Sequence, residues 1–368
     1  MNRLGNLRWI PALVIVCSLA ACSASSDNAG RAATTTTSPN DDARAVRQDI
    51  LDGWAEDGSG GVTVAMADRD AELQVLAAGT TGPGGGPMTA DSEFRVGSLS
   101  KTFVAVMVLQ VVAEDVAGLD DLVTQHVPEL TIADGITIRQ LLAHRSGLPD
   151  YVDEFLPAVS SDPARTWTHE DVLGVVVGQP LDFPPGEQFA YSNTNYIVAG
   201  LVLEQLTGRT VAENLESRIV EPLGLTGTYL APDTEREPIG AYSASLPGGD
   251  TAGASYRALE TGAGAAGAVV STAGDLATFL RALAHGDLLP DETYSEMTKG
   301  LPSQGESLGV FAADPPTTTG ISNLGQINGF QAFMQYDPAT EDLFVLLLND
   351  DTRSPEQLGN DLIATAAD

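Results

Sequence analysis

Cysteine is nearly absent from this 368-residue chain, which contains only Cys17 and Cys22. Both lie within the first 22 residues, so the rest of the chain has no disulfide framework and no thiol chemistry. The composition is otherwise that of a globular protein rich in Gly and Ala, with 43% hydrophobic residues to build a core.

Positive charge is also scarce, because 18 Lys and Arg stand against 50 Asp and Glu and give a net charge of −32. Such a chain is repelled by nucleic acid and by anionic membrane surfaces, and we expect no nucleic-acid partner. The four histidines, at positions 126, 144, 169 and 285, show no close metal-ligand spacing. We therefore expect neither a metal nor an organic cofactor.

The apolar run at residues 9–21 is too short for a comfortable membrane span. It follows a basic segment that contains Arg3 and Arg8, and this combination is typical of an export signal. The run ends in Leu-Ala-Ala followed by Cys22, which resembles the bacterial lipobox, in which the cysteine is diacylated. The alternative is a cleaved secretory peptide in which Cys22 is incidental.

These features divide the chain into three parts. We expect residues 1–21 to be a lipoprotein signal peptide, and residues 22–40, which are polar and low in complexity, to be a flexible tether. The protein would then lie on the outer face of the cytoplasmic membrane, held by a lipid anchor, or be secreted. Residues 41–368 would form the folded body.

The folded body begins and ends with strand patterns. Residues 41–55 have the apolar spacing of a helix, and the middle of the chain is mainly helices and loops. Strand patterns occur in five places: 61–67, 72–78, 323–330, 332–336 and 343–348. This order predicts an α+β fold whose antiparallel sheet takes its strands from both ends of the chain.

A short motif, Ser98-Leu-Ser-Lys101, precedes an apolar helical segment at 104–112. On a helix, Ser98 and Lys101 would project from the same face one turn apart. A lysine in an apolar site has a lowered pKa and can take the proton of a serine, which makes the serine nucleophilic. Taken alone, the same four residues are more often a helix cap followed by a surface lysine.

A second motif, Tyr191-Ser-Asn193, lies on the loop before a helix predicted at 197–206. A phenol can relay protons, and an amide can hold both a lysine and a substrate carbonyl. By itself the motif is equally typical of an aromatic residue in a turn, followed by an Asn that caps a helix.

The segment 137–150 is predicted to be a helix closed at Gly147, with His144 in its last turn as a capping or packing residue.

Ser98-x-x-Lys101, Tyr191-Ser-Asn193 and a glycine-containing strand at Gly325 occur in an order that resembles the penicillin-recognising serine hydrolases. These comprise the class C β-lactamases, the D-alanyl-D-alanine carboxypeptidases of the same branch and the related esterases. The similarity runs from about residue 45 to 350. It includes four accessory segments: 141–148 (LLAHRSGL), 183–187 (FPPGE), 221–228 (EPLGLTGT) and 265–273 (AAGAVVSTA).

The resemblance implies a β-lactamase/transpeptidase-like fold, with helices on the faces of the sheet and a mostly helical subdomain. It implies that Ser98 is acylated and that Lys101 and Tyr191 share general-base and general-acid duty. Asn193 would position Lys101 and the substrate. The oxyanion hole would be formed by the backbone N–H groups of Ser98 and of Gln326, the residue after Gly325.

One position departs from the family pattern. The third motif is usually Lys or His, any residue, Gly, and here it is Asn323-Leu324-Gly325. Asn323 is assigned to substrate binding, but it carries no charge, which disfavours carboxylate-bearing substrates such as penicillins and acyl-D-Ala-D-Ala.

Three activities remain open for an enzyme of this kind: carboxypeptidase, β-lactamase and esterase. Each would act on a small or peptide-like substrate of the cell envelope. The alternative from another class is a binding module that senses the cell wall or β-lactams and acylates slowly or not at all. A third alternative is a purely structural lipoprotein, in which the order of the motifs would be a coincidence.

Overall fold

The computed structural model describes residues 39–56, 58, 60–67, 72–243, 256–301, 307–313 and 320–365. The predicted signal peptide, Cys22 and nearly all of the predicted tether lie outside these ranges. Within them, no helix is long and apolar enough to cross a membrane.

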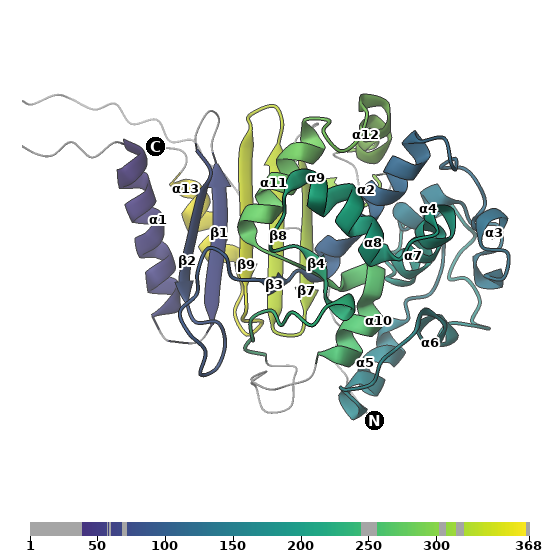
Figure 1. Cartoon of the computed structure of the whole chain (residues 1–368), viewed down its shortest axis with the longest axis horizontal. Helices are drawn as coiled ribbons and strands as arrows, with labels where there is room; N and C mark the ends of the chain where they lie inside the picture. The colour runs from purple at the N-terminus through teal and green to yellow at the C-terminus, as the bar shows by residue number, and fades with distance from the viewer. Residues whose placement is uncertain are drawn as a thin grey trace, which may run out of the picture.

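A six-stranded antiparallel sheet forms the left half of the molecule in Figure 1. Its strands follow the order β2-β1-β9-β8-β7-β6, so that the N-terminal hairpin pairs with the last strand of the chain. The bounds are β1 Gly61–Ala67, β2 Gln74–Gly79, β6 Phe311–Ala312, β7 Ile321–Ile327, β8 Phe330–Asp337 and β9 Asp342–Leu348. The predicted sheet from both chain ends is confirmed.

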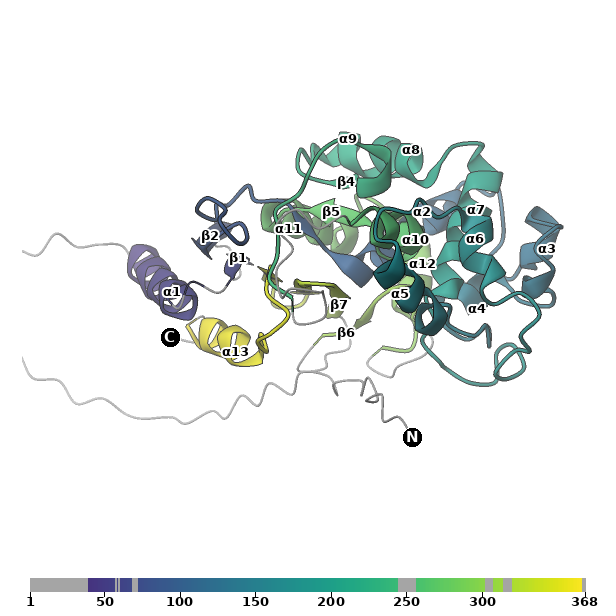
Figure 2. The ribbon, with the colours of Figure 1, turned by 90° about the horizontal axis from the view of Figure 1, so that it is seen from below.

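Helices cover both faces of the sheet, as Figure 2 shows from below. On one face α1 (Pro39–Ala55) and α13 (Glu356–Ala364) bury a small apolar cluster that includes Leu51, Val64 and Leu346. On the other face α11 (Ala273–Ala284) packs against β1, β8 and β9. Thr272 caps α11 by accepting a hydrogen bond from the Asp275 N–H (3.1 Å).

The right half of the molecule is mostly helical (Figure 1). It contains α3 Val123–His126, α4 Ile138–Leu142, α5 Val152–Ser161, α6 His169–Gly174, α7 Thr194–Thr207, α8 Val211–Leu215, α9 Glu221–Leu223, α10 Arg257–Gly267 and α12 Asp291–Thr298. A second, three-stranded sheet joins the two halves, in the order β3-β5-β4, with β3 Phe94–Arg95, β4 Tyr229–Leu230 and β5 Val269–Ser271. The predicted α+β class, with helices on the faces of the sheet and a mostly helical part beside it, is confirmed.

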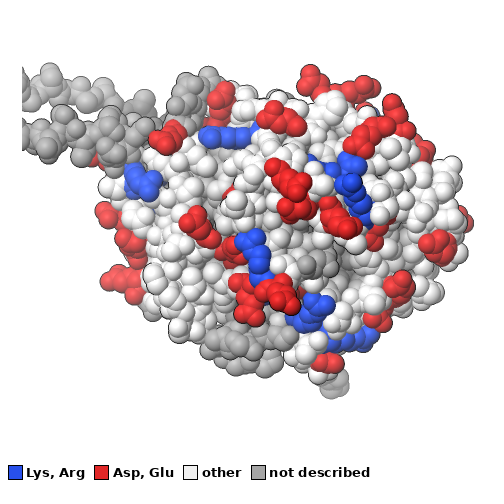
Figure 3. Space-filling model, viewed as in Figure 1, with Lys and Arg blue, Asp and Glu red and all other residues white. Residues whose placement is uncertain are grey.

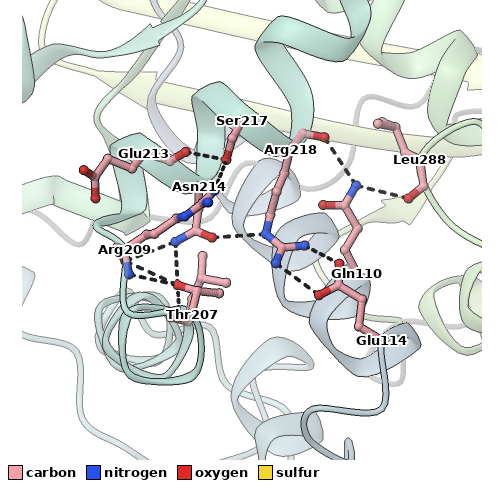
Figure 4. Close-up of polar contacts among 10 residues, drawn as sticks. Gln110, Glu114, Thr207, Arg209, Glu213, Asn214, Ser217, Arg218 and Leu288 are labelled. Atoms are coloured by element: carbon pink, nitrogen blue, oxygen red, sulfur yellow. Dashed lines mark hydrogen bonds and ion pairs between the residues drawn. The ribbon is translucent and has the colours of Figure 1, made fainter.

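Helix α2 (Ser100–Ala113) runs into the helical half, where it packs against α7 and α10, and almost all of its side chains are buried. A helix that is apolar on all sides belongs in a core. Its far end is fixed by polar contacts, shown in Figure 4. Arg218 binds both carboxylate oxygens of Glu114 at 2.6 and 3.1 Å, and Gln110 donates to the Leu288 carbonyl at 3.1 Å. These contacts hold the helix that carries Lys101 at its other end.

The helix predicted over 137–147 is shorter than expected. It ends at Leu142, and the chain then turns, because His144 (φ 53°) and Gly147 (φ 78°) adopt left-handed backbone conformations. A β-carbon on Gly147 would lie 2.1 Å from the Phe183 carbonyl oxygen, so this turn requires glycine. The prediction that His144 lies in the last turn of this helix was therefore wrong.

Candidate active site

Ser98 lies in a single turn of 3-10 helix, Gly97–Leu99, between β3 and α2. Its side chain is partly exposed, whereas the neighbouring residues Gly97 and Leu99 are buried. Gly97 has a φ of 51°, which favours glycine and turns the chain sharply out of β3. The turn therefore presents the Ser98 hydroxyl at the junction of the two halves of the molecule.

Lys101 lies in the first turn of α2 and is only 2% exposed. Its Nζ is within hydrogen-bond distance of three oxygens: Ser98 Oγ at 2.9 Å, Asn193 Oδ1 at 2.8 Å and the Ala266 carbonyl at 2.6 Å. Burial lowers the pKa of Lys101 to about 7, although the Asp150 carboxylate opposes this. A substantial fraction of Lys101 is therefore a neutral amine at neutral pH.

Tyr191 donates a hydrogen bond from its hydroxyl to Ser98 Oγ at 2.7 Å. Burial raises the pKa of this phenol well above its ordinary value, although the bond to Ser98 opposes the shift. The phenol is therefore protonated at neutral pH and is poised to donate a proton. Because Lys101 has a substantial neutral fraction near pH 7 and the Tyr191 phenol does not ionise there, Lys101 is the base available to Ser98 in the resting site.

Asn193 precedes α7, but its side chain does not cap that helix. Its Oδ1 accepts from Lys101, and its Nδ2 donates to Asp150 Oδ2 at 2.8 Å. Asp150 was not predicted as a site residue from the sequence, although it lies only two residues after the accessory segment 141–148. Only the folding of that loop against the start of α7 brings Asp150 to the site.

The third predicted motif lies on β7, which passes close to the Ser98 turn. A β-carbon on Gly325 would lie 2.0 Å from the Val96 carbonyl oxygen, so the strand can approach this closely only with glycine there. A β-carbon on Gly97 would lie 2.8 to 2.9 Å from the backbone O, C and N of Gln326. The peptide of Gln326 thus packs beside the residue that precedes Ser98, where an oxyanion-hole donor is needed.

Asn323 points away from the solvent and is 3% exposed. Its Nδ2 donates to Thr102 Oγ1 at 2.8 Å, and its Oδ1 accepts from the Leu324 N–H at 2.7 Å. Both ends of the amide are therefore used within the protein, and the side chain ties β7 to α2. This placement does not present Asn323 as a substrate-binding group. The next side chain, Leu324, is 59% exposed and apolar.

His144 packs against the site instead of acting as a base in it. Its ring stacks on that of Tyr191, with centroids 4.3 Å apart and planes at 25°, and its Nδ1 accepts from the Ser192 N–H at 3.2 Å. Burial, helped by the charge of Lys101, lowers the pKa of His144 to about 3. The imidazole is therefore neutral at neutral pH, and its stacking fixes the plane of the Tyr191 ring.

No group of three or more His, Cys, Asp or Glu residues in the described part of the chain is arranged to hold a metal ion. Figure 3 shows acidic side chains spread over one face of the molecule, with far fewer basic ones between them. At Ser98 the structure brings together one hydroxyl, one amine and one phenol, which suit nucleophilic acyl transfer.

The family model described as Beta-lactamase matches residues 46–368. A penicillin-binding protein of Bacillus subtilis (strain 168) is 31% identical over 144 residues, which are 39% of this chain and 31% of the relative. This chain thus matches less than a third of that relative's length.

Two solved structures are similar over nearly their whole length. One is D-amino acid amidase from Ochrobactrum anthropi SV3, with a TM-score of 0.76 and 28% identity over 89% of this chain and 99% of the other. The other is a D-stereospecific amidohydrolase from Streptomyces sp., with a TM-score of 0.72 and 30% identity over 87% of this chain and 97% of the other.

Proposed function

The chain belongs to the β-lactamase family, and from that premise we propose that it is a serine hydrolase that forms an acyl-enzyme on Ser98 and cleaves an amide or ester bond. The observation that carries this proposal is the pair of hydrogen bonds that Ser98 Oγ makes with Lys101 and Tyr191, at 2.9 and 2.7 Å. One partner is suited to accept a proton and the other to donate one.

In the acylation step, neutral Lys101 takes the hydroxyl proton of Ser98 while Oγ bonds to the substrate carbonyl carbon. The carbonyl oxygen becomes an oxyanion and is stabilised by the backbone N–H groups of Ser98 and Gln326, worth about 3 kcal/mol per donor. When the bond to the leaving group breaks, Tyr191 donates its proton to the leaving nitrogen or oxygen. The Lys101 ammonium then reprotonates the Tyr191 phenolate, and the acyl-enzyme remains.

In the deacylation step a water molecule replaces the leaving group. Lys101, neutral again, takes a proton from the water as the water oxygen attacks the ester carbonyl. The bond between the acyl carbon and Ser98 Oγ breaks, and the proton returns from Lys101 to Oγ. The acid product leaves, and the site regains its starting protonation state.

We propose that the substrate carries no carboxylate beside the scissile bond, and that a D-amino acid amide or a related ester fits better than a penicillin or an acyl-D-Ala-D-Ala peptide. The third motif offers no cation, because Asn323 is neutral and buried, and the exposed side chain beside it is the apolar Leu324. The similarity to D-amino acid amidase and to a D-stereospecific amidohydrolase supports this choice.

A side-by-side hydrolysis assay tests the proposal with five substrates: a D-amino acid amide, its L-enantiomer, a short-chain ester, a cephalosporin and an acyl-D-Ala-D-Ala peptide. We expect turnover of the D-amide and the ester, and its loss in Ser98→Ala. Faster hydrolysis of the cephalosporin or the peptide would contradict the substrate class. Stable labelling by penicillin without any turnover would instead favour the binding module.

We propose further that the protein is exported and tethered to the membrane through a diacylated Cys22, which would place it near substrates of the cell envelope. This rests on the sequence of residues 1–22 alone. Palmitate labelling and membrane fractionation of the full chain test it, with Cys22→Ala as the variant. The expected result is loss of the label and release of the protein. A variant that stays in the membrane fraction would exclude the anchor.

A further inference from the structure

Asp150 is a half-buried carboxylate directly behind the catalytic cluster. It lies in the loop before α5 and accepts three hydrogen bonds from protein groups. Two come from Asn193, from Nδ2 at 2.8 Å and from the backbone N–H at 3.2 Å, and the third comes from the Val152 N–H at 3.3 Å. The side chain is thus fixed on both oxygens, and its strongest contact is to the amide that also holds Lys101.

An ionised carboxylate can only accept hydrogen bonds, so the group that Asn193 directs at Asp150 must be its Nδ2. This settles which end of the amide faces the other way. Asn193 Oδ1 faces Lys101 Nζ at 2.8 Å, and the Ala266 carbonyl, also only an acceptor, faces the same nitrogen at 2.6 Å. Two of the three directions around Nζ are therefore occupied by acceptors.

A neutral amine has two N–H groups and one lone pair. When Lys101 is neutral, its two N–H groups go to Asn193 Oδ1 and the Ala266 carbonyl, because neither can donate. The lone pair is then left for the third direction, which is Ser98 Oγ at 2.9 Å. The same arrangement would fail with the Asn193 amide reversed, since Nδ2 would donate to Lys101 and compete for that lone pair.

We propose that Asp150 is a positioning residue for the acylation of Ser98: by fixing the orientation of the Asn193 amide, it directs the lone pair of neutral Lys101 at the Ser98 hydroxyl. This inference rests on the proposed function. It assigns Asp150 no contact with substrate, because its oxygens are occupied by Asn193 and by the Val152 N–H.

The charge of Asp150 also acts on the pKa of Lys101, separately from the orientation of the amide. Burial lowers the pKa of Lys101 to about 7, and the Asp150 carboxylate opposes that shift. The other titratable groups around the amine are the phenols of Tyr191 and Tyr196, whose ring centroids lie 5.0 and 5.8 Å from Nζ, and His144. All three are neutral near pH 7, because burial raises the pKa of each phenol and lowers that of His144. Tyr151, beside Asp150, is likewise a buried phenol with a raised pKa.

Asp150→Asn tests the inference with almost no change of shape. The backbone N–H groups of Asn193 and Val152 both donate to Oδ1, so the amide introduced at position 150 would keep its oxygen there and turn its own N–H groups toward Asn193 Nδ2. The Asn193 amide is then expected to reverse and to donate to Lys101. The rate of Ser98 labelling by a fluorophosphonate should fall about 100-fold, the range expected when a general base is misdirected. The pH at which the labelling rate reaches half of its maximum, its midpoint, should also be lower than in the wild-type protein, because the Asp150 carboxylate no longer raises the pKa of Lys101.

The exchange variant Asp150→Asn/Asn193→Asp separates positioning from folding. The amide now at position 150 can donate to one oxygen of the carboxylate now at position 193, and the other oxygen can accept from Lys101, which restores the hydrogen-bond pattern. Labelling should recover at least tenfold relative to Asp150→Asn. Its midpoint should move above that of the wild-type protein, because the negative charge now contacts Lys101 directly. Asp120→Asn, at an exposed carboxylate paired with Arg139, is the matched control and should label like the wild-type protein.

The outcomes separate the two proposals. If the wild-type protein is not labelled at Ser98, the proposed function itself fails. If it is labelled, and Asp150→Asn is labelled at the same rate with the same midpoint, the positioning role alone is overturned. An exchange variant that folds, by its thermal melt, but recovers no rate and shifts no midpoint also overturns that role.

Discussion

The two sides of the Ser98 turn differ in what they bring to the site. The helical side supplies reactive groups, since Lys101 and Tyr191 both bind Ser98 Oγ and are themselves held by Asn193, Ala266 and His144. The strand side supplies backbone and shape. There Gly325 and the Gln326 peptide pack against the turn, and Asn323 is buried.

Chemistry and substrate selectivity therefore depend on different parts of this protein. The helical side holds a complete nucleophile, base and acid, whereas the strand side has a neutral, buried Asn323 and an exposed, apolar Leu324. Changes on the helical side should therefore reduce the rate for every substrate. Changes to side chains on the strand side should mainly alter which substrate is preferred, unless they displace the backbone.

The largest effect is expected from Lys101→Ala on the helical side. It removes the base and leaves Asn193 Oδ1 and the Ala266 carbonyl without their partner. The turnover number kcat should fall about 1000-fold for ester and amide alike, within the range for general-base catalysis. Steady-state kinetics with both substrates measure this. A loss confined to one substrate would contradict the division between the two sides.

Gly325→Ala tests the backbone of the strand side. Its β-carbon would lie 2.0 Å from the Val96 carbonyl oxygen, so β7 must move away from the Ser98 turn and take the Gln326 N–H with it. We expect about a 100-fold loss of kcat, the cost of one oxyanion donor. Gly359→Ala, at a site with open space for a β-carbon, is the control. If Gly325→Ala retained full activity, Gln326 would not be the donor.

Tyr191→Phe removes the proposed acid but keeps the ring that stacks on His144. Its effect should depend on the leaving group, because an amine needs a proton to depart and a nitrophenolate does not. Hydrolysis of an amide should fall about 100-fold, whereas that of a nitrophenyl ester should fall about tenfold or less. Comparing kcat for the two substrates checks this. Equal losses would show that Tyr191 is not the acid.

Leu324→Lys adds a charge at the exposed position of the strand side and should have the smallest effect. A cation there would favour substrates that carry a carboxylate, by about tenfold in the ratio of kcat/KM for a cephalosporin to that for a neutral amide. Leu324→Met, which is a long side chain without charge, is the matched control and should leave the ratio unchanged. The same change of ratio in both variants would show that charge is not the cause.

Much of the fold could be predicted from the sequence, because it follows from local apolar patterns. The apolar run after Lys101 predicted a buried helix, and the strand patterns at 61–67 and 343–348 predicted strands that pair in one sheet. The order of the motifs also predicted the β-lactamase family, which the family model confirms.

The remainder depends on contacts between distant segments. The left-handed conformation of His144 and the close approach of Gly147 to Phe183 are not encoded by a local pattern. Asp150 becomes part of the site only because its loop folds against Asn193, and Asn323 is buried only because Thr102 of α2 lies opposite it. The sequence therefore predicted the site residues of the helical side, but neither the carboxylate of Asp150 nor the buried orientation of Asn323.

The pH dependence of Ser98 acylation reports the protonation state of Lys101, the base that the proposed mechanism requires. Labelling by a fluorophosphonate requires Lys101 as a neutral base, so its rate should rise as Lys101 loses its proton. We predict a rate that increases with pH, reaches half of its maximum near the pKa of about 7 and is absent in Ser98→Ala. A rate that does not change between about pH 5 and 9, or a midpoint near the ordinary lysine value of about 10.4, would contradict the account.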